Sequence, residues 1–147
     1  MNLEKIDIRL IKFFKKISVP MARFSLFVIF FWFGTLKVIG ISPATPLVKQ
    51  LFERTITGVS FQDFIIFFGA FEMLIGILFL IKGLERLVIP LLAIHMITTF
   101  LPLALLPQVT WSSFLVPTLE GQYIIKNLVV IAAAIGIAAH LYPIKKI

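Results

Sequence analysis

Residues Phe64–Ile81, FIIFFGAFEMLIGILFLI, form an apolar run that contains one carboxylate, Glu72. A run of this length can cross a bilayer, for which a helix needs about 20 residues. An ionised acid in the middle of a membrane costs at least about 2.5 kcal/mol, so such a residue faces a bundle interior or a water-filled cavity. Gly69, Glu72 and Gly76 share one helix face because they are spaced three and four residues apart. This face predicts close contact with a neighbouring helix around Glu72.

The composition indicates a membrane protein. The chain has 147 residues, of which 60% are hydrophobic and 14% are charged, and its mean hydropathy is +1.06. Because so few charged residues cannot cover the surface of a water-soluble protein, we expect lipid around it. The formal net charge is +7, but the basic residues flank the apolar runs, which the positive-inside rule explains better than nucleic-acid binding does. We therefore expect membrane lipids as partners and no nucleic acid.

The apolar runs predict an all-α membrane protein with a single domain over residues 1–147, built as a four-transmembrane-helix bundle. Residues 3–18 repeat apolar positions at helical spacing with lysine and arginine opposite, which predicts an amphipathic helix in the headgroup region. Pro20 predicts a break before the first span. The other predicted elements are spans at 21–38, 61–82, 87–106 and 121–142, with a short extracytoplasmic surface helix at 46–57.

Short local signals predict where these helices begin, bend and pack. Thr45 is the expected cap of the surface helix, and Ser60 followed by Asp63 has the spacing of a capping box at the start of the second span. Pro102 lies inside the third span and predicts a kink there. The last span has a small-residue face for close packing, formed by Ala132, Gly136 and Ala139.

The basic residues outside the spans predict the topology. One set of span ends carries most of the positive charge, whereas the opposite set carries Lys49 and Arg54. By the positive-inside rule both termini are expected in the cytoplasm, with the long first loop and the loop around Trp111 outside. The basic residues of the cytoplasmic set are Lys5, Arg9, Lys12, Lys15, Lys16, Arg23, Lys82, Arg86, Lys145 and Lys146.

Polar residues of all four spans are predicted to meet in one internal cluster. Glu72 and His95 lie near the middle of the second and third spans, and we consider both candidate catalytic residues for proton transfer. The candidate ligand-binding residues are Trp32, Lys37, Thr98, Thr99, Lys126 and Asn127.

Structural alternatives remain open for the charged members of this cluster. Glu72 could pair with a lysine only to stabilise the bundle, and His95 could be a packed, hydrogen-bonded histidine. Lys37 and Lys126 could extend to the outer headgroups instead of facing inward.

Several kinds of chemistry have no residues to support them. The chain has no cysteine, which removes cysteine-ligated iron–sulfur clusters and c-type haem attachment. His95 and His140 differ in depth by roughly 10 Å at 1.5 Å per residue, too far to flank one haem iron. No set of residues has metal-ligand spacing, so we expect no metal site.

A small, mostly apolar molecule with one or two oxygens would suit the polar cluster. A quinone fits this description, with Trp32 and phenylalanines as walls and with lysine, histidine or glutamate reaching its carbonyl groups. A carboxylate or an imidazole in a half-dry site can also exchange the protons that quinone reduction requires. Quinone is therefore the one cofactor that the residues suggest.

Three segments resemble DoxX-like membrane proteins: FFWFGTLK at Phe30–Lys37, GAFEMLIGILFLI at Gly69–Ile81 and LEGQYIIKNLVVIAAAIGI at Leu119–Ile137. The resemblance implies a four-helix bundle in the cytoplasmic (inner) membrane of a prokaryote. Some members of that family are small subunits of thiosulfate:quinone oxidoreductase and others belong to oxidative-stress membrane complexes. The long first loop, which starts SPATP, is closer to a branch without assigned activity. The family-type positions are Trp32, Gly34, Lys37, Glu72, Lys126 and Asn127.

Three functions follow as alternatives. The small size and the lack of cysteine and metal motifs favour an accessory subunit of a larger membrane complex of redox or respiratory type, with other membrane subunits or further copies of the chain as partners. The second is a stand-alone quinone-binding oxidoreductase that uses Glu72, His95 and Lys126. The third is a transporter of a small solute through the polar cluster.

Overall fold

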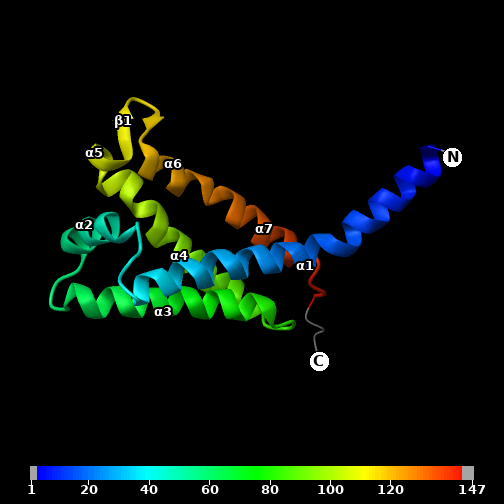
Figure 1. Ribbon diagram of the computed structural model, residues 1–147, viewed down its shortest axis with the longest axis horizontal. Helices are drawn as coiled ribbons and strands as arrows, with labels where there is room; N and C mark the ends of the chain where they lie inside the picture. The colour runs from blue at the N-terminus through cyan, green and yellow to red at the C-terminus, as the bar shows by residue number, and fades with distance from the viewer. Residues whose placement is uncertain (1–2, 144–147) are drawn as a thin grey trace.

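The computed structural model describes residues 3–143 and is mostly helical. Four helical segments are long and apolar enough to cross a membrane: α1 (Leu3–Val38), α3 (Phe61–Leu80), α4 (Glu85–Leu105), and α6 together with α7 over Leu119–Ala138. They run back and forth through one bundle (Figure 1). The predicted helical bundle with four candidate spans is confirmed.

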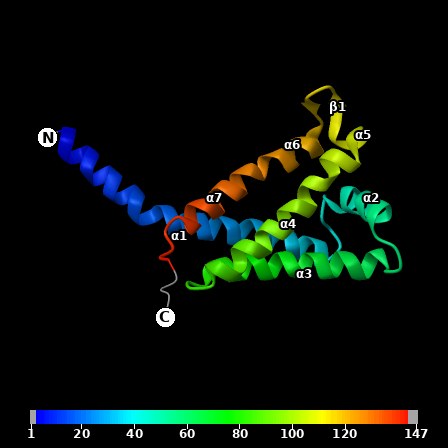
Figure 2. The same cartoon turned by 180° about the vertical axis from the view of Figure 1, so that it is seen from behind.

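The first helix is longer than predicted. A break was expected at Pro20, between residues 3–18 and 21–38, but α1 continues through this proline from Leu3 to Val38. A proline inside a helix removes one backbone hydrogen bond and can bend the helix without ending it. The N-terminal part of α1 projects beyond the other helices (Figures 1 and 2). Its predicted place in the headgroup region stays a prediction.

Helices α1 and α3 pack side by side because glycines let their backbones approach (Figure 1). A Cβ atom on Gly34 would lie 2.5 Å from the carbonyl oxygen of Gly69, and one on Gly69 would lie 2.7 Å from the carbonyl oxygen of Gly34. A Cβ atom on Gly76 would lie 2.8 Å from the amide nitrogen of Phe31. The predicted close contact along the glycine face of α3 is confirmed, and α1 is the helix that makes it.

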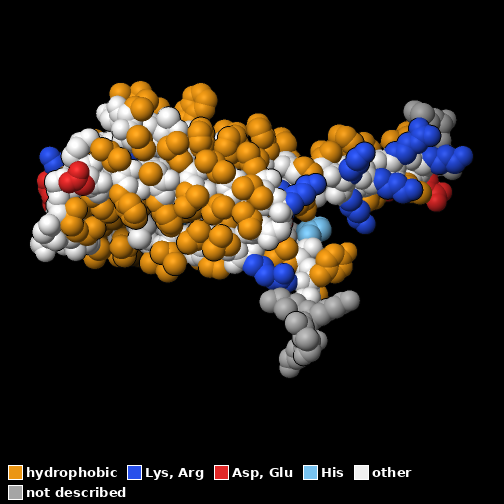
Figure 3. All heavy atoms as spheres, turned by 90° about the horizontal axis from the view of Figure 1, so that it is seen from below, with side chains coloured by type: hydrophobic (Ala, Val, Ile, Leu, Met, Phe, Trp, Pro, Cys, Tyr) orange, Lys and Arg blue, Asp and Glu red, His pale blue; other side chains and the backbone are white. Residues whose placement is uncertain are grey.

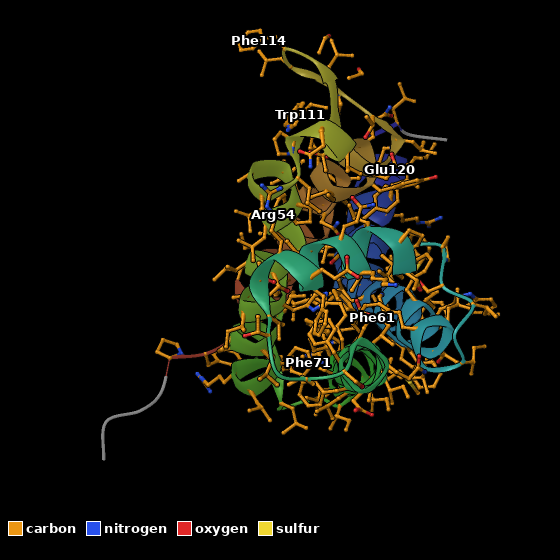
Figure 4. All side chains as sticks on the ribbon, turned by 90° about the vertical axis from the view of Figure 1, so that its left-hand side faces the viewer. Arg54, Phe61, Phe71, Trp111, Phe114 and Glu120 are labelled. Carbon is orange, nitrogen blue, oxygen red and sulfur yellow. The ribbon has the colours of Figure 1, made fainter. Side chains whose placement is uncertain are left out.

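A short helix, α2 (Thr45–Thr55), crosses one end of the bundle, with Arg54 on it (Figure 4). Arg54 donates a hydrogen bond of 2.8 Å to the carbonyl of Leu105, which fastens α2 to α4. The expected cap is wrong: Ala44 precedes the helix, and the Thr45 hydroxyl is buried without a partner. Ser60 is the cap of α3, as predicted, and its hydroxyl accepts a 3.1 Å hydrogen bond from the amide of Asp63.

The connection after α4 contains structure that the all-helical prediction lacked. α5 (Pro107–Thr110) leads into a hairpin of β1 (Trp111–Ser113) and β2 (Val116–Pro117) at the same end of the bundle as α2 (Figures 1 and 2). The Trp111 indole donates a 3.0 Å hydrogen bond to the carbonyl of Leu103, so this side chain ties the hairpin to α4.

The last span consists of α6 (Leu119–Lys126) and α7 (Leu128–Ala138), which meet at Asn127. Its predicted small-residue face does not pack within the chain. A Cβ atom on Gly136 would meet nothing within 4 Å, and Ala132 and Ala139 are exposed. The buried face of α7 consists instead of Val130, Ala134 and Ile137.

The hydrophobic core lies between the four spans. The outer surface of the bundle is also apolar. Phe79, Val88 and Ile75 are fully buried in this core. The outer surface of the bundle carries hydrophobic side chains over most of one face (Figure 3). Water-soluble proteins rarely expose apolar patches of such extent, so this surface, like the four apolar helices, suggests a location in a membrane.

Candidate functional site

Three ionisable side chains meet in the interior of the bundle: Lys37 of α1, Glu72 of α3 and His95 of α4. The Lys37 Nζ atom donates a 2.6 Å hydrogen bond to Glu72 Oε2, and His95 Nε2 lies 3.3 Å from Glu72 Oε1. The three residues are only 5%, 6% and 3% exposed, respectively. We call Lys37, Glu72 and His95 the buried triad.

The glycine contact between α1 and α3 positions the first two members. Lys37 lies three residues after Gly34, and Glu72 lies three residues after Gly69, so both face the same interhelical contact. A Cβ atom on Gly69 would lie 2.9 Å from the Cβ atom of Lys37. The close approach therefore holds the lysine side chain against α3, where its ammonium reaches the carboxylate one turn further on.

Aromatic rings surround His95. The ring of Phe30 stands edge-on to the imidazole with centroids 5.4 Å apart, and the Phe68 ring lies at 5.1 Å. The ring centroid of Phe71 lies 6.2 Å from that of His95. The Lys37 ammonium lies 5.7 Å from the centre of the Phe68 ring. The triad is therefore a polar centre inside an aromatic shell. Sequence alone did not single out Phe30, Phe68 and Phe71 among 16 phenylalanines.

One polar atom of the triad has no hydrogen-bond partner. His95 Nδ1 is buried and unpartnered. The hydroxyls of Thr98 and Thr99 lie on the same helix but donate to the carbonyl of His95, at 2.7 and 3.0 Å. Leaving a buried polar atom without a partner costs about 1–3 kcal/mol, so Nδ1 is the atom of this site with capacity for a further ligand.

The other predicted members of the polar cluster lie outside the triad. Trp32 is 64% exposed on the surface of α1. Lys126 is exposed, and its ammonium lies 5.3 Å from the ring centre of Tyr123. The Asn127 amide donates to the carbonyls of Tyr123 and Ile124 on its own helix. Of the eight predicted residues, the structure brings together three, Lys37, Glu72 and His95.

The chemistry open to the triad is set by its charges. An ammonium and a carboxylate cancel, so a neutral imidazole beside them leaves the site without net charge, which suits a buried position. The carboxylate and the imidazole also lie close enough for a proton to be shared between Glu72 and His95. The same contacts can therefore stabilise a bundle or move a proton.

A second buried ion pair, which the sequence analysis missed, lies where α4 begins. Arg23 of α1 pairs with Glu85 of α4 and also donates a 3.1 Å hydrogen bond to the carbonyl of Phe79 near the end of α3. Glu85 is the first residue of α4, and Arg23 lies in the middle of α1, near the start of the predicted span at 21–38. Opposite charges at matching ends of two predicted spans were therefore the available signal. The sequence analysis had used Arg23 only as one of the basic residues that predict the topology.

The described part of the chain contains no cluster of side chains that could coordinate a metal ion. Among residues 3–143, no three histidine, aspartate or glutamate side chains come together in a way that could hold an ion. His140 is exposed, with Nδ1 2.8 Å from the carbonyl of Gly136.

Comparison of the chain with protein-family models, with curated proteins and with solved structures finds no match. The resemblance to DoxX-like proteins therefore stays a prediction from the quoted segments. Conclusions about function come from the chain's own residues.

Proposed function

We propose that this chain is a small accessory subunit of a larger membrane complex, of the redox type that the DoxX-like resemblance implies. The observation that carries the proposal is the closure of the buried triad. Lys37 and His95, on two different helices, each contact the Glu72 carboxylate of a third helix, and all three residues are almost completely shielded from the surroundings. In this role the triad fixes the relative positions of α1, α3 and α4.

The polar face of α6 supports a protein partner. Gln122 and Lys126 lie in an apolar helical segment long enough to cross a membrane, and both are exposed on the chain by itself. Polar side chains in such a segment face protein or water in preference to lipid. A neighbouring subunit would provide that environment, and an ammonium is best matched by a carboxylate of the partner.

Native mass spectrometry after gentle extraction from the protein's own membranes tests this proposal. We expect a partner polypeptide in a fixed ratio to this chain. The double substitution Gln122→Leu with Lys126→Leu should remove the partner without unfolding the chain, since both side chains are exposed. Gln62→Leu, which changes an exposed glutamine of α3, is the matched control and should retain it. A chain that is always recovered without partners would contradict the proposal.

A second candidate function, quinone binding, is favoured by the unpartnered Nδ1 atom of His95. This atom lies inside an aromatic shell of Phe30, Phe68 and Phe71, and the hydroxyl of a reduced quinone could donate a hydrogen bond to it. Glu72 would then exchange protons with the reduced ring through the imidazole. Transport of a small solute remains a prediction from the sequence.

The quinone content of the extracted protein tests the second candidate. A bound quinone in a one-to-one ratio that disappears with His95→Phe would support it, because this change keeps an aromatic ring and removes both ring nitrogens. Thr98→Val is the control, since its hydroxyl binds only the helix backbone. Equal quinone content in the wild type and in His95→Phe would exclude His95 as the contact.

A further inference from the structure

An open groove runs between α4 and α7 on the outside of the bundle. Its volume is about 590 Å³, and all 12 residues that line it are apolar. This volume falls within the range of about 300–1,000 Å³ that is typical of small-molecule sites. The groove lies apart from the buried triad, because none of the triad residues lines it.

The groove is hollow because both helices present alanines to it. Ala93 and Ala104 of α4 face Ala134 and Ala138 of α7 across it, with larger side chains such as Phe100 between them. The lining extends along α4 from residue 89 to residue 104, which corresponds to roughly 22 Å at 1.5 Å per residue. Half of the hydrocarbon core of a bilayer is about 15 Å thick, so the groove can accommodate a full acyl chain of one leaflet.

Basic side chains mark one end of the groove. Helix α4 begins and α7 ends at this end, and Arg86 is one turn before the first lining residue, Ile89. Arg86 is exposed and donates to the carbonyl of Tyr142, which brings it to the chain that follows α7. Lys82 and His140 are exposed near the same helix ends. The end of the bundle from which α1 projects shows this gathering of Lys, Arg and His side chains (Figure 3).

The acidic residue nearest to this end does not cancel the charge. Glu85 is buried and pairs with Arg23, so its carboxylate is directed into the bundle. The exposed cations Lys82 and Arg86 are therefore left facing the surroundings. Basic clusters between membrane helices attract anionic lipid headgroups, with a gain of about fivefold in binding for each lysine or arginine near the surface.

We propose that the groove between α4 and α7 binds one anionic phospholipid, with an acyl chain along the alanines and its phosphate beside Arg86 and Lys82. The apolar lining matches the chain, and the cations at one end match the headgroup. This inference is independent of the proposed function, because it involves neither the triad nor the polar face of α6.

Lipid retention by the purified full chain tests the proposal. The protein is extracted in an uncharged detergent with equal amounts of phosphatidylglycerol and phosphatidylcholine, and bound lipid is counted by native mass spectrometry. We expect one phosphatidylglycerol per chain, in clear preference to phosphatidylcholine. Arg86→Gln should weaken this binding about fivefold, whereas Arg54→Gln, at the other end of the bundle, should leave it unchanged.

A second pair of variants tests the groove itself. Ala93→Phe places a ring into the groove from an exposed position and should abolish retention of phosphatidylglycerol without unfolding the chain. Ala132→Phe adds the same ring to an exposed position of α7 outside the groove and should retain the lipid. Equal retention of both lipids, equal loss in both phenylalanine variants, or a dimer that Ala93→Phe dissociates would each overturn the proposal.

Discussion

The contact between α1 and α3 and the face shared by α4 and α7 are two opposite solutions to packing apolar helices. The first has glycines on both helices, backbones in direct contact and a buried ion pair across it. The second has alanines on both helices but stays open as a groove. In lipid, which is as apolar as leucine, helices associate through close packing and polar contacts. Small residues therefore permit close packing but do not cause it. The two helices must also be oriented so that their small-residue faces meet.

The strongest test of this comparison is to add a side chain to each region. Gly69→Leu should prevent α1 from packing on α3, because even the Cβ atom would lie 2.7 Å from a backbone oxygen that cannot move aside. Overpacking of this kind costs about 1–3 kcal/mol or more, and here it also displaces Lys37. We expect little folded protein in size-exclusion chromatography after extraction.

The control for this test lies on α7. Gly136→Leu adds the same side chain at a position where a Cβ atom meets nothing within 4 Å. It should elute and melt like the wild type. If both variants behaved alike, the close glycine contact would not be what holds α1 to α3.

The next largest effect is expected from the buried triad. Lys37→Met leaves the Glu72 carboxylate without its ammonium, and breaking a buried pair from one side costs about 3–5 kcal/mol. The double variant Lys37→Met with Glu72→Leu removes both charges and should recover most of the lost thermal stability in detergent. Lys126→Met, which changes an exposed lysine, is the control and should have little effect. A double variant no more stable than Lys37→Met would contradict a purely structural pairing.

Much of the first region could be predicted from sequence, and little of the second. One carboxylate between two glycines in an apolar run requires a polar partner and a close neighbour, and the structure supplies both through Lys37 and Gly34. The face of Ala132 and Gly136 has the same kind of spacing but remains exposed. Small residues show that a face can pack closely, whereas the orientation of the whole helix decides whether it does.

The candidate site shows the same limit. His95 and Glu72 were predicted to meet because both lie near the middle of their spans, and depth can be counted along a sequence. Lys126 was included on depth as well, and Trp32 as an aromatic wall of the site, but both face outward. Depth follows from residue number, while the rotation of a helix about its axis depends on packing against all its neighbours. Weakly amphipathic spans give little signal for that rotation.

A smaller effect is expected from the ion pair where α4 begins. Arg23→Met removes the partner of Glu85 and the donor to the Phe79 carbonyl. Hydrogen bonds to charged groups contribute about 1.5–3 kcal/mol, and this pair lies at a span end where water can partly replace the guanidinium. The melting temperature in detergent should fall less than in Lys37→Met. A larger fall would place the main ionic contact of the bundle at this end instead of at the triad.

The smallest effect is expected from two hydroxyls, those of Ser60 and Thr45, that the sequence predicts to be helix caps. Ser60→Ala removes the cap of α3 and should cost about 1 kcal/mol, because the Asp63 amide loses its acceptor. Thr45→Val likewise removes a hydroxyl at the start of α2. The hydroxyl of Thr45, however, is buried without a partner. Replacing an unpaired buried hydroxyl by a methyl group of similar shape removes a penalty and no bond. Thermal melts should therefore show a decrease for Ser60→Ala and no decrease for Thr45→Val, and a decrease of equal size in both would show that Thr45 does cap α2.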